Sequence, residues 1–231
     1  MNPNTSLFVT IFINFIIISL GYVVYKRNKK ILINKTFFLF TTFFVIWSTF
    51  NFLETWVENI DLVKLFIKLD FTFAPITIFF LSFFLFNFPD TNKRLESFYG
   101  KIYFSLPLFL IFIFSLTDQV VGDIKFVDNI IRFNFGPMYP IYGFIIAIYV
   151  IWPLILLILK YKKYIGIKKL QTLYIILGFS STFIILLICN LFLQNKISVE
   201  VFRLSNNSSI ILVLCMTYAI VRYRLMDIRL F

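Results

Sequence analysis

The sequence predicts an all-α integral membrane protein: a bundle of seven transmembrane helices with its N-terminus outside the cell and its C-terminus in the cytoplasm. Of 231 residues, 60% are hydrophobic and only 14% are charged, and the charges form short clusters between long apolar segments. A soluble domain of this length cannot bury so much apolar surface, and a charge that faces hydrocarbon costs several kcal/mol. These two observations predict the helices, and the distribution of basic residues predicts their orientation.

Seven apolar segments are long enough to cross a bilayer, which takes about 20 mostly apolar residues. They are Ser6–Tyr25, Thr36–Trp56, Leu65–Phe88, Ile102–Thr117, Met138–Leu159, Leu170–Leu193 and Ser205–Val221. The fourth is the shortest. Because seven is an odd number, the two ends of the chain are expected on opposite sides of the membrane.

Basic residues follow the first, third, fifth and seventh segments, whereas the other connections hold more acidic than basic residues. The positive-inside rule places the basic connections in the cytoplasm. The net charge of +11 would suggest a nucleic-acid partner in a soluble protein. Here topology and anionic headgroups explain it, so we expect the lipid bilayer as a partner and no nucleic acid.

The longest outer connection, Asp118–Pro137, alternates apolar and polar residues around Val127. Alternation of this kind is typical of a small β-hairpin, which would cap the outer end of the bundle. A plain surface loop explains the same residues equally well. Both interpretations remain open at this point.

Polar side chains recur along the second segment: Trp47, Asn51, Glu54 and Glu58 are spaced so that one helix face carries all four. Lipid cannot satisfy such a stripe, so it should point into the bundle. One interpretation is a ligand or ion site that opens outward. The other is an interface belt, in which the carboxylates reach the outer headgroups.

Further polar residues are expected at the same depth in other segments. The predicted ligand-binding residues are Trp47, Asn51, Glu54, Asp70, Tyr139, Tyr142, Asn190 and Asn206. Asp70 is expected near the start of the third helix. Ordinary hydrogen bonding between helices, worth about 0.6 kcal/mol per bond, is the competing interpretation for each residue.

Two sets of residues predict how the helices pack. Asn14 and Gly21 share a face of the first segment, where an amide can bond across helices and a glycine permits close approach. Pro75, Pro107 and Pro153 lie in or near helix interiors, and each removes a backbone hydrogen bond and tends to kink its helix. We expect these kinks to shape the bundle, with hinge motion as the alternative.

The sequence argues against catalysis by this chain, and no cofactor or metal site is expected. It contains no His, and both Cys lie inside apolar segments. The seventh segment has no Lys for a retinal Schiff base. A small-molecule or ion transporter or channel remains the alternative function, although no internal repeat and few mid-membrane ionisable groups support it.

The residues from Ala219 to Arg229 carry a more specific signal, the run AIVRYRLMDIR at the exit of the last segment. Weaker matches precede it in order, at Leu20–Gly21, Trp47 with Glu54, and Ala74–Pro75. With these residues the chain resembles the seven-transmembrane N-terminal sensor region of bacterial histidine kinases. The resemblance covers nearly the whole length.

The resemblance implies a signal-sensing input region of a two-component receptor, multi-pass in the plasma membrane, with an unknown ligand. Residues 1–231 would form one sensor domain, and 222–231 would begin a cytoplasmic signalling linker. The last helix would pass the signal to a cytoplasmic output domain or partner kinase, since no kinase or cyclase domain is expected in this chain. Pairing as a homodimer is also implied. The expected output residues are Arg222, Tyr223, Arg224 and Asp227.

Overall fold

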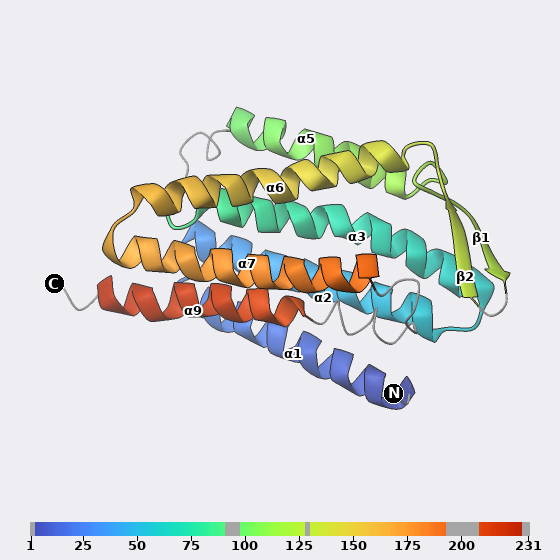
Figure 1. The fold of residues 1–231 in the computed structure, drawn as a ribbon, viewed down its shortest axis with the longest axis horizontal. Helices are drawn as coiled ribbons and strands as arrows, with labels where there is room; N and C mark the ends of the chain where they lie inside the picture. Colours follow the sequence, from blue (N-terminus) through green and yellow to red (C-terminus); the bar gives the residue numbers. More distant parts are fainter. Residues whose placement is uncertain (1–2, 91–97, 128–129, 193–207, 228–231) are drawn as a thin grey trace.

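A computed structural model describes residues 3–90, 98–127, 130–192 and 208–227. This part of the chain contains seven helices and one two-stranded hairpin. The helices lie side by side and run in alternating directions, so that the two chain ends lie at opposite ends of the bundle (Figure 1). We call the end with the hairpin and the N-terminus the hairpin end, and the opposite end the basic end.

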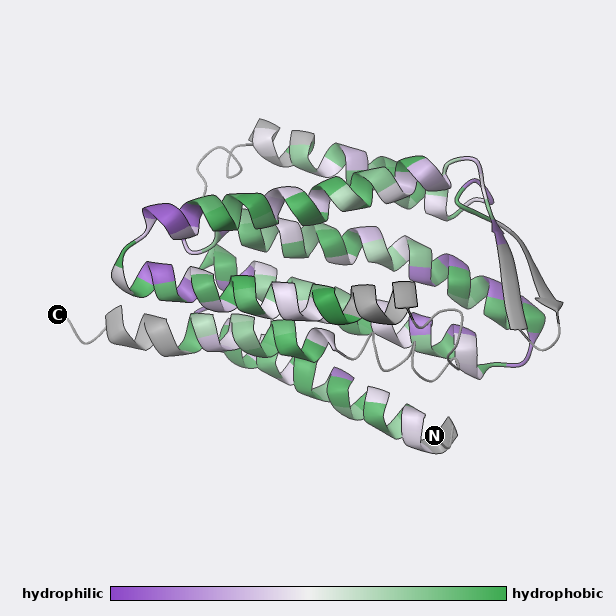
Figure 2. Cartoon of the chain, viewed as in Figure 1, coloured by the Kyte–Doolittle hydropathy of each residue, from purple (hydrophilic) through white to green (hydrophobic). Residues whose placement is uncertain are grey.

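The helices coincide with the seven predicted segments, although the beginning of the last segment lies outside the described residues. Their bounds are α1 Pro3–Arg27, α2 Leu32–Trp56, α3 Ile60–Asn87, α5 Phe98–Ser115, α6 Tyr139–Lys163, α7 Gly166–Phe192 and α9 Ser209–Asp227. By length and composition, α1, α2, α3 and α6 are each able to cross a membrane, and α5 and α9 contain shorter apolar stretches. Hydrophilic segments of α6 and α7 meet at the basic end (Figure 2).

Two boundaries near the hairpin end differ from the prediction. Helix α3 begins at Ile60 because the Asn59 side chain accepts hydrogen bonds from the backbone N–H groups of Asp61 and Leu62. Asp70 therefore lies several turns inside α3 rather than at its start. Helix α2 ends at Trp56, so Glu58 lies beyond the helix and does not share its polar face. The Glu58 side chain is exposed.

The outer connection forms a hairpin, as one of the two interpretations predicted. Strands β1 (Val121–Val127) and β2 (Ile130–Phe135) pair antiparallel, with a bulge between Val121 and Ile124. Val120 and Val121 are fully buried against the bundle. Lys68 of α3 holds the preceding loop through a 2.6 Å salt bridge to Asp118. The hydrogen bond and charge of Lys68 lower the pKa of Asp118.

The core consists of two apolar clusters. The first, called the basic-end core, joins residues of α1, α2, α3, α6, α7 and α9 and includes Phe37, Phe84 and Met216. The second lies among α3, α5, α6 and β1 and includes Ile67 and Tyr149. Most buried area is aromatic or aliphatic, as expected for packing among lipid-exposed helices.

Helices α1 and α2 pack closely through the two residues predicted for this role. The Asn14 amide donates to the Thr49 hydroxyl over 3.3 Å. A Cβ atom at Gly21 would overlap the Thr41 side chain, so this crossing requires glycine. Both packing predictions for the first segment are confirmed.

The prolines of α3 and α6 each leave one carbonyl without its helical partner, and a hydroxyl from the neighbouring helix binds each carbonyl. Pro75 has no N–H for the carbonyl of Phe71, four residues earlier, and the Tyr142 hydroxyl of α6 donates to that oxygen over 2.8 Å. Pro153 frees the carbonyl of Tyr149 in the same way, and Ser82 of α3 donates to it. Two reciprocal bonds therefore join α3 and α6.

A third hydroxyl extends this network to α5. Tyr149 donates to the carbonyl of Phe104, which lies three residues before Pro107 inside α5. Hydroxyls of neighbouring helices therefore bind backbone carbonyls near all three prolines, and the expectation that the prolines kink their helices stays a prediction. A buried carbonyl without such a partner would cost about 1–3 kcal/mol.

At the basic end, lysines of α6 and α7 hold the last turn of α3. Lys160 donates to the carbonyls of Phe86 and Phe88 over 2.7 and 2.6 Å. Lys168 forms a 2.9 Å salt bridge with Asp90. Partial burial acts to raise the pKa of Asp90, but the hydrogen bond and charge of Lys168 outweigh it, so the pKa is lowered. The pair is half exposed, so it contributes at most about 1 kcal/mol.

A double-mutant cycle tests the bond at Pro75. We expect Tyr142→Phe to lower the free energy of unfolding by about 1 kcal/mol, because the Phe71 carbonyl loses its donor. In a Pro75→Ala background, residue 75 regains an N–H that reaches the same carbonyl, so the cost of Tyr142→Phe should fall by at least half. Unfolding in mixed micelles measures all four proteins.

Tyr149→Phe is the matched control, because its acceptor lies in α5. The loss of free energy of unfolding caused by Tyr149→Phe should be the same whether residue 75 is proline or alanine. Equal costs of Tyr142→Phe in both backgrounds would contradict the pairing of proline and hydroxyl.

Candidate functional site

Six of the eight predicted ligand-binding residues come together between α2, α3 and α6 in the half of the bundle nearest the hairpin. We call them the polar cluster: Trp47, Asn51, Glu54, Asp70, Tyr139 and Tyr142. Helices α2 and α3 are consecutive and α6 is distant from both in sequence, so the expected convergence of side chains from different helices is observed for these six residues.

Helix α2 supplies three members from one face, as its spacing predicted. Asn51 is buried, and its amide lies 3.4 Å from the Glu54 carboxylate one turn later. Trp47 lies one turn before Asn51 and packs edge-on against Phe44, with ring centroids 5.5 Å apart. The i, i+4 and i+7 positions of a helix therefore arrange an indole, an amide and a carboxyl in a line.

Asp70 of α3 faces this line of side chains. Its carboxyl lies near that of Glu54, and the N–H groups of Asn51 and Trp47 are directed toward it. Asp70 Oδ1 and Trp47 Nε1 are nevertheless buried without a partner of full hydrogen-bond geometry among the described residues. Unsatisfied polar atoms of this kind cost about 1–3 kcal/mol each.

The tyrosines of α6 close the cluster from the third side. Tyr142 is buried beside Asp70 and Tyr139, and its hydroxyl is the one that binds the Phe71 carbonyl. The Phe71 ring contacts both tyrosine rings, with centroids 5.6 Å and 6.3 Å away. Phe135 of β2 stacks on Tyr139 at 3.7 Å, so the hairpin contacts the cluster directly.

This arrangement favours a ligand that carries positive charge or hydrogen-bond donors. Two carboxyls lie close together in an apolar bundle, and each needs a donor or a counter-charge to be stable there. No three His, Cys, Asp or Glu side chains lie together in the part of the chain that the structure describes. The cluster therefore presents a carboxyl pair.

The remaining predicted residues are only partly placed. Asn190 belongs to α7, but its side chain lies outside the described residues, as does all of Asn206. The expected output residues Arg222, Tyr223, Arg224 and Asp227 belong to α9, and their side chains are likewise not described. Helix α9 extends beyond the predicted apolar segment, from Val221 to Asp227.

Two contacts near the end of α9 were not predicted. Arg27 of α1 donates to the carbonyl of Val221 over 3.2 Å, and Gln171 of α7 donates to that of Ala219 over 3.2 Å. Arg27 is one of the basic residues that follow the first predicted segment. A cation at the end of one helix readily reaches carbonyls of its neighbour. Side chains of α1 and α7 thus both bind α9 near Val221.

Comparison with known proteins places the chain in a family. The family model described as the N-terminal 7TM region of histidine kinase matches residues 7–229. No curated protein matches the chain. The seven alternating helices and their apolar composition agree with a membrane sensor region of this kind. Because the match covers nearly the whole chain, the protein belongs to the family of N-terminal seven-transmembrane regions of histidine kinases.

Proposed function

We propose that the chain is the stimulus-sensing input region of a two-component receptor and that the stimulus acts at the polar cluster. In this proposal, residues 1–231 form one multi-pass domain of the plasma membrane. The hairpin end faces outward, and residues 222–231 lead to a cytoplasmic output domain or partner kinase. The observation that carries the proposal is that the carboxyls of Glu54 and Asp70 lie near each other, with buried unpartnered polar atoms beside them, inside an apolar bundle.

A site of this kind is suited to switching. A ligand shifts a conformational equilibrium only by its differential affinity for the two states. Moving α2 relative to α3 changes the separation of the Glu54 and Asp70 carboxyls, since one lies on each helix. A cationic or donor ligand would favour the packing that brings them together, because a positive charge or a hydrogen-bond donor stabilises carboxyls that are buried in apolar surroundings.

Helix α2 offers a path from the cluster to the output helix. Trp47, Asn51 and Glu54 occupy its half near the hairpin, whereas Phe37, Phe40 and Phe44 belong to the basic-end core. The same core contains Met216 and Ile220 of α9. A shift of α2 would therefore disturb the packing on which α9 rests, and α9 is the helix that leads out of the membrane.

A transporter is less well supported than a receptor. Among the described residues, the polar cluster occupies only the half of the bundle nearest the hairpin. Buried aromatic side chains, including Phe37, Phe40 and Phe84, fill the interior beyond it. A transport path needs polar groups across the full thickness, or a movement that exposes the site to both sides. Flux of a solute through liposomes containing the protein would reverse this ranking.

Cysteine accessibility tests the proposed orientation. In a background without Cys189 and Cys215, Glu58→Cys should react with a membrane-impermeant maleimide in intact cells, because Glu58 is exposed at the hairpin end. Lys163→Cys, exposed at the basic end, should react only after the cells are permeabilised. Labelling of both positions from the same side would rule out the proposed topology.

Substitution of the carboxyl pair tests the stimulus site. With a histidine-kinase core joined in frame after Phe231, we expect Glu54→Gln and Asp70→Asn each to change basal autophosphorylation. Each substitution removes a carboxyl that needs a donor or a counter-charge inside the bundle, so it changes the relative stability of the two packings. A shift of about 1 kcal/mol changes a two-state ratio about fivefold.

Glu58→Gln is the matched control, since Glu58 is an exposed carboxylate at the same end of α2. It should leave autophosphorylation unchanged. If the three variants behave alike, the polar cluster is not where the stimulus acts.

A further inference from the structure

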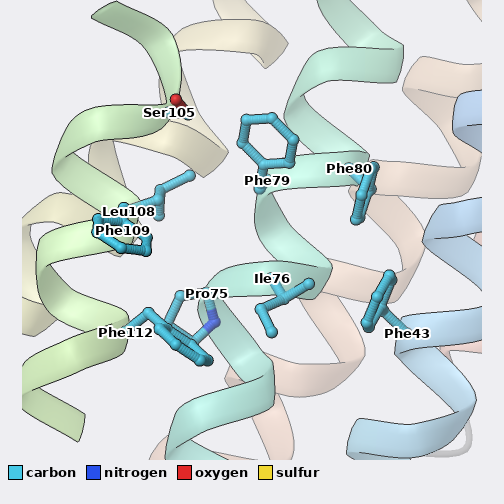
Figure 3. Close-up of a pocket in the computed structure, with 9 residues that line it drawn as sticks. All are labelled: Phe43, Pro75, Ile76, Phe79, Phe80, Ser105, Leu108, Phe109 and Phe112. Carbon is cyan, nitrogen blue, oxygen red and sulfur yellow. The ribbon is translucent and has the colours of Figure 1, made fainter. Parts of the chain in front are cut away.

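An apolar groove of about 320 Å³ lies between α2, α3 and α5, and no residue of the polar cluster lines it (Figure 3). Leu108 is buried, whereas Phe109 is 56% exposed. In Figure 3 the side chains of α5 approach those of α3, and Phe43 of α2 faces Phe80. The lining residues are Phe43, Pro75, Ile76, Phe79, Phe80, Ser105, Leu108, Phe109 and Phe112.

The groove lies at the middle depth of the bundle and adjoins the face that contacts lipid. Phe43 and Pro75 are each near the midpoint of their helix. Leu106, Phe109 and Leu110 expose about half of their surface beside it. In a bilayer whose hydrocarbon core is about 30 Å thick, this depth is reached by acyl chains and by no headgroup.

The chemistry of the walls selects an apolar occupant. Ser105 is the sole lining residue with a side-chain polar atom, and its hydroxyl donates to the carbonyl of Ile102 over 3.2 Å. A helix of a second copy does not fit, because one turn about 10 Å wide and about 5.4 Å long already exceeds the groove. A single flexible hydrocarbon chain fits its size and lining. We propose that the groove binds one acyl chain of a bilayer lipid.

Occupancy of this groove bears on the backbone break in α3. Pro75 forms part of the wall, and the carbonyl that it frees is held by Tyr142 of the polar cluster. A bound acyl chain would therefore pack against Pro75, whose freed carbonyl partner at Phe71 is bound by Tyr142. The groove is a site distinct from the polar cluster, and its occupancy can be tested whether or not the cluster senses a stimulus.

Photocrosslinking tests the proposal on the unmodified chain. The protein is reconstituted in phosphatidylcholine vesicles that contain an increasing fraction of phosphatidylcholine with a diazirine near the end of one acyl chain. After irradiation, mass spectrometry maps the labelled residues. We expect labelling of Phe109 and Ile76 to saturate as the photolipid fraction rises. Ile151 and Trp152, exposed apolar residues at the middle of α6, should show a linear rise.

A pair of adjacent substitutions provides the second arm. Ser105→Phe fills the groove and should reduce the labelling of Ile76 several-fold, to the level of Ile151. Leu106→Phe adds an aromatic ring on the neighbouring lipid-facing position and should leave that labelling intact.

Linear labelling of the groove overturns the proposal, because it indicates annular lipid only. Labelling below that of Ile151 also overturns it, because another occupant then covers the groove. If Ser105→Phe does not fold, the saturation measurement on the unmodified chain decides alone.

Discussion

The architecture depends on how α3 and α6 satisfy the carbonyls that their prolines expose. In a membrane, water is not at hand to bind a freed carbonyl, so the donor must come from the protein. Tyr142 supplies it for the break at Pro75, and Ser82 supplies it for the break at Pro153. Each helix thus provides the hydroxyl that the other requires. Their relative height is fixed as a result, because a shift by one turn would leave both carbonyls unpaired.

This fixed pair determines where the polar cluster forms. Asp70 immediately precedes Phe71, the residue whose carbonyl Tyr142 binds, so the bond that serves the proline also places the phenol beside the carboxyl. Helix α2 then completes the cluster from the other side through Asn51 and Glu54. Stability and the candidate site thus share one tyrosine. Polar residues in membrane helices often have a structural role, and here one residue serves both purposes.

The sequence predicted the features that depend on local composition. Apolar length predicted the helices, and the spacing from Trp47 to Glu54 predicted one face of α2. The expected position of Asp70 at the start of α3 was wrong, because the first turns of α3 carry Asp61, Lys64 and Lys68 and do not stand out as apolar. The hydroxyl donors of the two prolines could not be predicted, since Phe71 and Tyr142 are joined only by the fold. The hairpin was one of two open interpretations, and the register of its strands decided it.

The position of α9 constrains any route by which a change near the hairpin reaches the output end. This helix packs chiefly against α7 and α1, and Gln171 of α7 and Arg27 of α1 bind its carbonyls at Ala219 and Val221. Helix α1 in turn packs on α2, with Gly21 allowing the closest approach. The α3–α6 pair is fixed by its two proline bonds, and side-chain bonds of Asn14 and Asn34 join α1 to α2. Between α2 and α3, stacked aromatic rings such as Phe43 and Phe80 meet instead. A movement of α1 and α2 together against α3 keeps the bonds within each pair, so the α2–α3 contact is the one best able to take two packings.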